Sequence, residues 1–218
     1  MADSTISNDD ISAKLPEGAD VTLDKGSKGG NQLTVAKNVK GMEVTVTGGD
    51  LGVVGEKVTN ATITTKAKKG DVDKITTQTE GIFGSTIQNK GKGSIDFTHN
   101  TAEFKKSVID AGANKKRNDS VKFGNDAKII KGNVIMGKGN DTVRFKKNAT
   151  FQGKTTVDLG KGGADQVLVK SNNGVEGGKL QINTFTKKDE LTIGKTTFDY
   201  KDIKGGADLP GNIKVDLA

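Results

Sequence analysis

Cysteine and tryptophan are missing from this sequence, and histidine, tyrosine and proline are almost missing. The 218 residues contain no Cys, no Trp, one His, one Tyr, two Pro and eight Phe. Without Cys there is no disulfide bond, thiolate metal site or cysteine nucleophile, and the single His99 excludes a cluster of imidazole ligands. Most classes of metalloenzyme are therefore excluded. The scarcity of large aromatic side chains separately predicts a thin hydrophobic interior.

Long hydrophobic runs are missing as well. Gly, Lys, Thr or Asn interrupts every apolar stretch within about six residues, whereas a transmembrane helix needs roughly 18. Residues 1–30 contain six acidic residues and no apolar run that fits the core of a signal peptide. We therefore expect a soluble chain with no Sec signal and no membrane partner. Export through a C-terminal signal stays open, because such signals are poorly defined in sequence.

Glycine, lysine and an internal repeat are abundant. The chain has 30 Gly and 34 Lys plus Arg against 27 Asp plus Glu, which gives a net charge of +7. An Asp followed by a short strand-like segment recurs along the chain at a nearly constant interval. The seven copies begin at Asp50, Asp73, Asp96, Asp119, Asp141, Asp165 and Asp189. Apolar runs lie on both sides of each Asp, so the period describes one repeated unit of about 23 residues.

The repeated unit is built of strands. Segments such as TVRF and VLVK alternate with period 2, Val, Ile and Thr dominate, and Gly is too frequent for helices. A unit this short cannot bury its own apolar face, so copies must stack. The sequence predicts an all-β, single-chain β-solenoid, or β-helix, of about seven coils. Val143 and Val167 occupy equivalent places in adjacent units, so we expect both to point inward and touch.

The flanks differ from the array. We expect an N-terminal arm or cap at residues 1–30, the repeat array at 31–204, and a C-terminal cap or docking strand at 205–218. Both prolines, Pro16 and Pro210, lie outside the array. Proline removes a donor from a β-ladder and is typical of protected sheet edges. The ends are therefore expected to cap the solenoid or to meet a partner, and self-association through them is a further expectation.

Two repeats carry a recognisable motif. Gly137-Lys138-Gly139-Asn140-Asp141-Thr142-Val143 and the corresponding segment from Gly160 to Val167 resemble the haemolysin-type calcium-binding (RTX) nonapeptide. The RTX family repeats its motif in tandem, one nonapeptide after another, whereas this chain shows it about once per coil. Degenerate GKGNDTV repeats are also similar to those of virion structural proteins of marine phages, cyanophages in particular. The first resemblance implies a calcium-binding module of an exported bacterial protein, and the second implies a virion component.

The column of Asp residues has two interpretations. Stacked glycine-rich corners that carry Asp141 and Asp165 one coil apart offer carboxylate and carbonyl oxygens, which are calcium ligands. Alternatively, each Asp hydrogen-bonds its own turn and pairs with a nearby lysine, since bare carboxylates about 4.8 Å apart repel one another. A Lys precedes most of these Asp residues by three or four positions, as Lys138 precedes Asp141 and Lys161 precedes Asp165. We favour the lysine interpretation and assign no metal site.

The positive charge raises the question of nucleic acid. Lysine supplies 32 of the 34 basic residues, and the only arginines are Arg117 and Arg144. Arginine is the residue that makes bidentate contacts to guanine and phosphate, and no aromatic platform for stacking bases accompanies the lysines. The one basic cluster is Lys115-Lys116-Arg117. We expect attraction to an acidic protein surface and no specific binding of nucleic acid.

No residue carries a catalytic signature. The repeats are even in length with short loops, unlike β-helix enzymes that gather acids and bases in one groove. His99, in the segment FTHN, is expected to be a surface residue. We therefore predict a non-enzymatic structural protein with no catalytic residue, no cofactor and no metal. The favoured setting is a bacteriophage virion, as a capsid decoration or a tail or fibre appendage bound to capsid or tail proteins, and the alternative is the calcium-binding RTX-type module.

Overall fold

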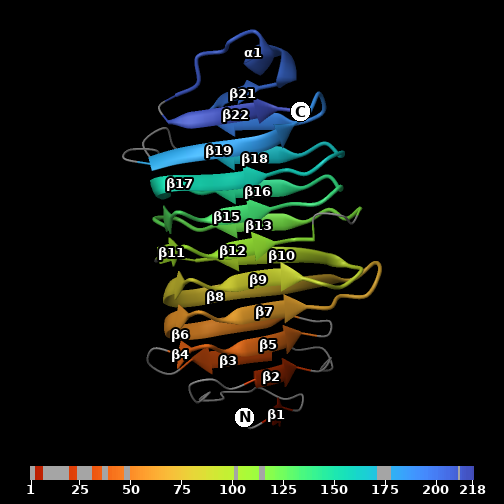
Figure 1. Cartoon of the computed structure of the whole chain (residues 1–218), viewed down its shortest axis with the longest axis vertical. Coiled ribbons are helices and arrows are strands. Elements are labelled where there is room, and N and C mark those ends of the chain that lie inside the picture. Colours follow the sequence, from red (N-terminus) through yellow and green to blue (C-terminus); the bar gives the residue numbers. More distant parts are fainter. Residues whose placement is uncertain are drawn as a thin grey trace.

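The chain forms a column of stacked β-strand coils in the computed structural model (Figure 1). The structure describes the backbone of residues 3–6, 20–23, 31–35, 39–46, 50–100, 103–112, 116–170, 178–210 and 212–218, with side chains from residue 40 onward. Neighbouring strands are parallel, apart from one antiparallel pair near the C-terminal end. The predicted all-β solenoid is confirmed. Within the described ranges, no helix has the length and apolar character needed to cross a membrane.

The described strands form three faces, and the longest strands bend around a corner and serve two faces. The first face is made of β3 (Asn31–Val35), the start of β6 (Leu51–Thr59), the start of β8 (Val72–Phe83), β10 (Ser94–His99), β13 (Ser120–Phe123), β16 (Thr142–Phe145), β18 (Gln166–Val169) and β20 (Glu190–Ile193). The second face is made of β4 (Val39–Lys40), the ends of β6 and β8, β11 (Glu103–Lys105), β14 (Lys128–Ile130) and the start of β17 (Thr150–Asp158).

The third face runs along the whole column. Its strands are β1 (Asp3–Ile6), β2 (Asp20–Leu23), β5 (Glu43–Val46), β7 (Thr62–Thr65), β9 (Thr86–Asn89), β12 (Val108–Asp110), β15 (Asn133–Ile135), the end of β17, β19 (Gly178–Phe185) and β22 (Ile213–Leu217). The predicted terminal segments, residues 1–30 and 205–218, therefore both contribute strands to this ladder. The strand predicted to dock on a partner, β22, pairs with β19 of its own chain.

The number of coils differs slightly from the prediction. Eight described strands stack on the first face, because β3 adds a rung before the unit that begins near Asp50. Register partners on this face are unevenly spaced in the sequence, since Asn31 pairs with Leu51 whereas Leu51 pairs with Ile75. The period seen in the sequence is thus an average over coils of unequal length.

Inward side chains form continuous rows along the column. On the first face, one row consists of Leu51, Ile75, Phe97, Val121, Val143, Val167 and Leu191, all almost fully buried. Val143 and Val167 are register partners with no exposed surface, which confirms the predicted contact row. Because each apolar side chain stacks on another in the next coil, apolar surface is removed from water in every coil. This burial stabilises the fold by about 25 cal/mol for each Å².

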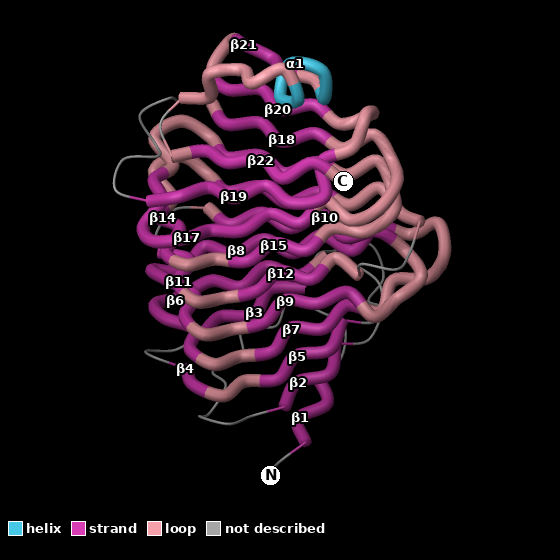
Figure 2. The backbone as a smooth tube through the Cα atoms, turned by 45° about the horizontal axis from the view of Figure 1, so that its top comes forward, coloured by secondary structure: helices cyan, strands magenta, loops and turns pink. Residues whose placement is uncertain are grey.

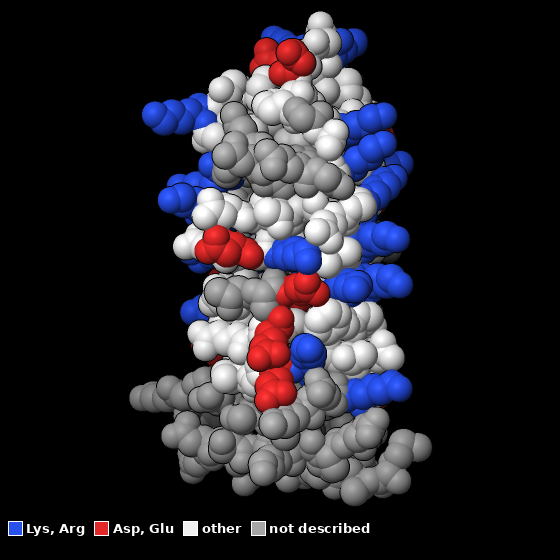
Figure 3. Space-filling model, turned by 90° about the vertical axis from the view of Figure 1, so that its left-hand side faces the viewer, with Lys and Arg blue, Asp and Glu red and all other residues white. Residues whose placement is uncertain are grey.

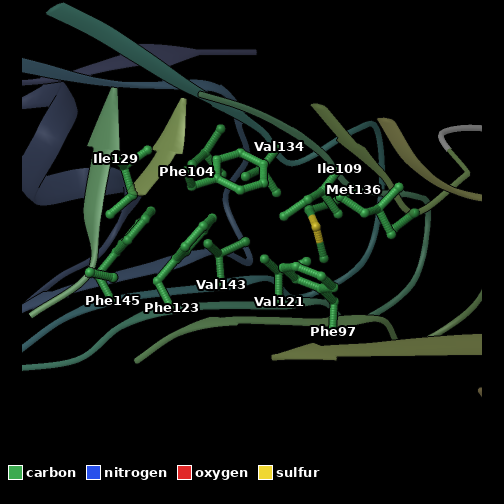
Figure 4. Packing of buried hydrophobic residues seen from close by; sticks show 14 of the residues in the cluster. Phe97, Phe104, Ile109, Val121, Phe123, Ile129, Val134, Met136, Val143 and Phe145 are labelled. Carbon is green, nitrogen blue, oxygen red and sulfur yellow. The ribbon is translucent and has the colours of Figure 1, made fainter. Parts of the chain in front are cut away.

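Phenylalanine contributes more to the interior than its scarcity suggested. Six of the eight Phe side chains are fully buried: Phe97, Phe104, Phe123, Phe145, Phe151 and Phe185. Phe123 and Phe145 lie on successive coils with their rings stacked, centroids 5.2 Å apart (Figure 4). The scarcity of large aromatic side chains predicted a thin interior, yet most of the aromatic rings are placed inside it. A three-faced coil encloses enough space for an aromatic ring, and these rings fill it.

The C-terminal end of the column is irregular. Strand β21 (Thr196–Phe198) folds back antiparallel on β20, and the short helix α1 (Tyr200–Lys204) follows it. Asp199 caps the helix by accepting hydrogen bonds from the backbone N–H groups of Lys201 and Asp202. Leu191 on β20 pairs in register with Phe198, so β21 covers the open edge of the first face.

Candidate functional site

A column of buried aspartates runs along the corner where the third face turns into the first. The loops of this corner gather along one side of the column, where the third-face strands end (Figure 2). Asp119, Asp141, Asp165 and Asp189 lie here on four successive coils, each immediately before a first-face strand. Their exposed fractions are 2% or less. We call these four residues the aspartate ladder.

Backbone amides of one coil donate to carboxylates of the next. Oδ1 of Asp119 accepts from the N–H of Ile95 at 2.8 Å, and Oδ1 of Asp141 accepts from the N–H of Asp119 at 2.7 Å. The series continues with Asp165 accepting from Asp141 at 2.8 Å and Asp189 accepting from Asp165 at 2.9 Å. Each carboxylate thus satisfies an amide that a loop would otherwise bury unpaired.

The second carboxylate oxygen holds the turn of its own coil at two of the four positions. Oδ2 of Asp141 accepts from the N–H of Gly137 at 2.9 Å, and Oδ2 of Asp189 accepts from the N–H of Thr186 at 2.6 Å. The prediction that each Asp hydrogen-bonds its own turn is confirmed at Asp141 and Asp189. An aspartate at these positions therefore connects three pieces of backbone: its own strand, its own loop and the preceding coil.

Two of the predicted members do not belong to the ladder. Asp96 pairs in register with Ser120 and Lys74, so Ile95 occupies the ladder position of that coil. Asp50 is exposed and, because Leu51 pairs with Ile75, it is level with Lys74 and not with Asp73. Asp73, the register partner of Ile95, is buried at the ladder position. A one-residue shift turns a strand side chain from the interior to the solvent, which an approximate period does not detect.

The predicted pairing of ladder carboxylates with lysine was wrong. No ion pair joins Asp119, Asp141 or Asp165 to Lys116, Lys138 or Lys161 in the part of the chain that the structure describes. These lysines are exposed while the aspartates are buried, and backbone amides take the place that lysine was expected to fill. Burying an ammonium group costs far more than pointing it into water.

Two of the four ladder carboxylates, those of Asp141 and Asp189, are poorly arranged for calcium. Calcium requires six to eight oxygen ligands at about 2.3–2.6 Å. Both oxygens of Asp141 and of Asp189 already accept backbone N–H groups, which points those amides toward the space a cation would need. Among the described residues, no group of three or more His, Cys, Asp or Glu side chains is arranged to hold a metal ion.

Burial changes the acidity of the ladder. Removal from water is the main reason that the pKa of Asp165 is raised to about 8. The hydrogen bond from the backbone of Asp141 lowers this pKa, and the neighbouring carboxylates of Asp141 and Asp189 raise it. Burial likewise raises the pKa of Asp119 to about 6, although the Ile95 amide and Arg117 oppose the rise. The pKa of Asp141 is also raised by burial. Part of the ladder is therefore protonated near neutral pH.

Arg117 lies beside Asp119, at the N-terminal end of the aspartate ladder. Its guanidinium group is buried and donates from Nη1 to the carbonyls of Gly91 and Gly93 and from Nη2 to that of Ala111. Its Nε lies 3.8 Å from Oδ2 of Asp119. Arg117, one member of the basic cluster expected at residues 115–117, therefore lies in the interior. Lys115 lies outside the described residues.

Glycine replaces Arg117 at the equivalent point of the next coil. Arg117-Asn118-Asp119 aligns with Gly139-Asn140-Asp141, and a Cβ atom on Gly139 would overlap the carbonyl oxygen of Arg117. Gly163 lies equally close to the carbonyl of Gly139 on the coil after that. This close stacking of the loops brings each amide within reach of the next carboxylate, and any side chain at Gly139 would prevent it.

His99 is an interior residue, in contrast to the surface position expected for it. It is fully buried, its Nδ1 lies 2.8 Å from Oγ1 of Thr77, and its ring meets Phe104 and Phe123 edge to face. The alternation in Phe97-Thr98-His99 shows why: Phe97 points inward, so His99 two residues later does too. His99 thus packs as part of the aromatic interior.

A different corner of the column, where the second face turns into the third, carries exposed lysines. Lys106 and Lys131 have left-handed backbone angles, φ of 50° and 52°, and each N–H donates to a carbonyl of the next coil. Lys154 and Lys179 follow on the next two coils and are register partners. All four are exposed, and we call them the lysine corner. Figure 3 shows basic side chains in series along the right-hand edge of the second face.

The lysine corner brings the backbones of like-charged residues close together. Neighbouring strands are about 4.8 Å apart, and two unit charges about 4 Å apart in water repel by about 1 kcal/mol, so these side chains gain by pointing apart. Within the described ranges, neither ion pair includes any of the four lysines. An acidic partner would relieve this repulsion along the whole corner. These lysines were not singled out from the sequence, although they recur at intervals of 25, 23 and 25 residues, close to the length of the repeat.

Comparison with known proteins returned no relative: no protein-family model matches the chain, and no significant match was found among the curated proteins or the solved structures.

Proposed function

We propose that the chain is a non-enzymatic structural protein that presents the lysine corner to an acidic protein surface, and that it does so as a component of a bacteriophage virion. The observation that carries this proposal is the run of exposed lysines at this corner, with Lys106 and Lys131 at equivalent left-handed positions and Lys154 and Lys179 as register partners on the next two coils. Complementary charge steers association and fixes the register between two surfaces. The partner would be an acidic capsid or tail protein.

The interior supports a structural role. Apolar rows run without interruption through the described coils, so each rung supports its neighbours as in other repeat proteins. The groups that would be the first candidates for chemistry serve the fold instead. The ladder carboxylates accept backbone amides, and His99 is enclosed by Thr77 and two phenylalanines.

The alternative is a calcium-binding RTX-type module of an exported bacterial protein. Its support is the likeness of the segments around Asp141 and Asp165 to the RTX nonapeptide. Against it stand the hydrogen bonds that occupy the oxygens of Asp141 and Asp189. The virion proposal is therefore preferred.

Two measurements test the proposal. Antibodies against the chain should label phage particles purified from its source, and binding to poly-L-glutamate should test the lysine corner directly. Replacing all four corner lysines with Gln should weaken poly-L-glutamate binding more than replacing Lys74, Lys147, Lys170 and Lys188, which are exposed elsewhere. Equal weakening by the two sets would show that only net charge matters. Absence from particles, with release of the chain by an exporter, would support the RTX-type alternative.

A further inference from the structure

A shallow depression lies on the solvent side of the first face, over strands β13 and β16, whose preceding residues Asp119 and Asp141 belong to the buried aspartate ladder. Its volume is about 340 Å³, and three neighbouring strands, β10, β13 and β16, provide its lining. The lining residues are Asp96, Thr98, Ser120, Lys122, Thr142 and Arg144. Every one of them is polar, and two are cationic.

Strand register arranges these side chains in two rows. Asp96, Ser120 and Thr142 form one row across the strands, and Thr98, Lys122 and Arg144 form the other two residues further along. All six point away from the core, because the residues between them, Phe97, Val121 and Val143, are buried. The hydroxyl groups of Ser120 and Thr142 therefore lie beside the two cations.

The juxtaposition of Lys122 and Arg144 is the unusual feature of this depression. The two residues are direct register partners on adjacent strands, where like charges destabilise a sheet. Asp96 shares the depression, yet neither cation forms an ion pair with it or with another acid in the part of the chain described. A folded protein keeps such a pair at little cost when an anion lies between the charges.

We propose that this depression binds a phosphate or sulfate group that belongs to a hydroxyl-bearing small molecule. The guanidinium fork of Arg144 and the ammonium group of Lys122 would hold two oxygens of the anion. The hydroxyls of Ser120 and Thr142 donate to the same group. Asp96, at the other end of its row, accepts hydrogen bonds from hydroxyl groups of the ligand and repels a second anionic group, so an ester with one charged end fits the site.

Amide chemical-shift titration of the full chain tests this site. The probes are inorganic phosphate, inorganic sulfate and glycerol 3-phosphate, at constant ionic strength set with chloride. We expect saturable shifts centred on residues 120–122 and 142–144. The double variant Lys122→Gln/Arg144→Gln should bind about tenfold more weakly or not at all, because each charge-assisted hydrogen bond is lost. Lys188→Gln removes an exposed lysine outside both the depression and the lysine corner and should leave the titration unchanged.

The outcomes separate a site from general charge attraction. Shifts that increase linearly without saturation, or that persist in the double variant, would overturn the proposal. Glycerol 3-phosphate should bind at least as tightly as inorganic phosphate in the native chain, and Asp96→Asn should remove that advantage. Weaker binding of the ester than of phosphate would contradict the role given to Asp96. Binding of sulfate but not of either phosphate probe would assign the site to sulfate esters.

Discussion

The backbone N–H of Asp141 donates to Oδ1 of Asp165 on the next coil, at 2.8 Å. Asp141 in turn accepts the N–H of Asp119, so one residue both gives and receives a hydrogen bond along the column. A carboxylate used in this way connects loops that contain too much glycine to hold their own conformation. The aspartates of the GKGND-type motif therefore serve here as structural connectors between coils.

Stability should fall as the pH rises through the range in which Asp165 ionises. The pKa of Asp165 is raised to about 8 in the folded chain from an ordinary value of 3.8, so the folded state holds the proton longer than the unfolded state. Between these two pH values the unfolded state binds fewer protons, and the free energy of unfolding decreases with pH. Asp165→Asn cannot ionise and should flatten the dependence of the melting temperature on pH across this window.

The control for this experiment is Asp71→Asn, since Asp71 is exposed. It should leave the slope of the native chain unchanged. A slope that is identical in the native chain and in Asp165→Asn would show that Asp165 has an ordinary acidity and that the ladder is fully ionised.

Chelation of calcium should leave the fold intact. Because the oxygens of Asp141 and Asp189 accept backbone amides, we expect no metal-binding energy to be linked to folding. EGTA should therefore change neither the β-rich circular dichroism spectrum nor the melting temperature. A large loss of structure that added calcium restores would contradict this view of the ladder and favour the RTX-type module.

A charge placed in the inner row should unfold several coils. Val143 is fully buried between Val121 and Val167, so Val143→Asp should lower the free energy of unfolding by roughly 3–5 kcal/mol. Urea denaturation measures the effect. Thr150→Asp adds the same charge on an exposed strand position and should change stability by less than about 0.5 kcal/mol. Similar curves for the two variants would mean that Val143 is not in the core.

Replacing a lysine of the corner with glycine should stabilise the chain at position 131 and destabilise it at position 154. Lys131 has a φ of 52°, which costs an L-residue about 1–2 kcal/mol, so Lys131→Gly should raise the free energy of unfolding by about 1 kcal/mol. Lys154 lies in β17 outside the left-handed region, and Lys154→Gly should lower stability by about 0.5–1 kcal/mol. Thermal unfolding of both variants checks the difference, and destabilisation by Lys131→Gly would contradict the corner geometry.

The fold could be predicted because its signals are local and repeated. Alternation in TVRF and VLVK placed Val143 and Val167 inside, and the strand period excluded helices. The same alternation applied to Phe97-Thr98-His99 would have placed His99 inside, but the rarity of histidine directed attention to function. The buried Phe side chains were not predicted because the composition gives only their number. It does not show that six of the eight lie in the interior.

The ladder was harder to predict than the fold. Coil length varies along the column, so an average period assigned Asp96 to a position that Ile95 occupies. Lysines near the aspartates in sequence suggested ion pairs, whereas the partners are backbone amides one whole coil away. The alignment of Arg117-Asn118-Asp119 with Gly139-Asn140-Asp141 was a visible signal that Arg117 enters the corner.

Zero-length cross-linking in purified phage particles tests the central claim most directly. A carbodiimide joins lysine amines to carboxylates that touch them, and mass spectrometry locates the joined residues. The proposed virion role predicts cross-links from Lys106, Lys131, Lys154 and Lys179 to acidic residues of a capsid or tail protein, with few from Lys74 or Lys170, which are exposed on other parts of the surface. Absence of the chain from the particles, or cross-links to a partner only through lysines outside the corner, would contradict it.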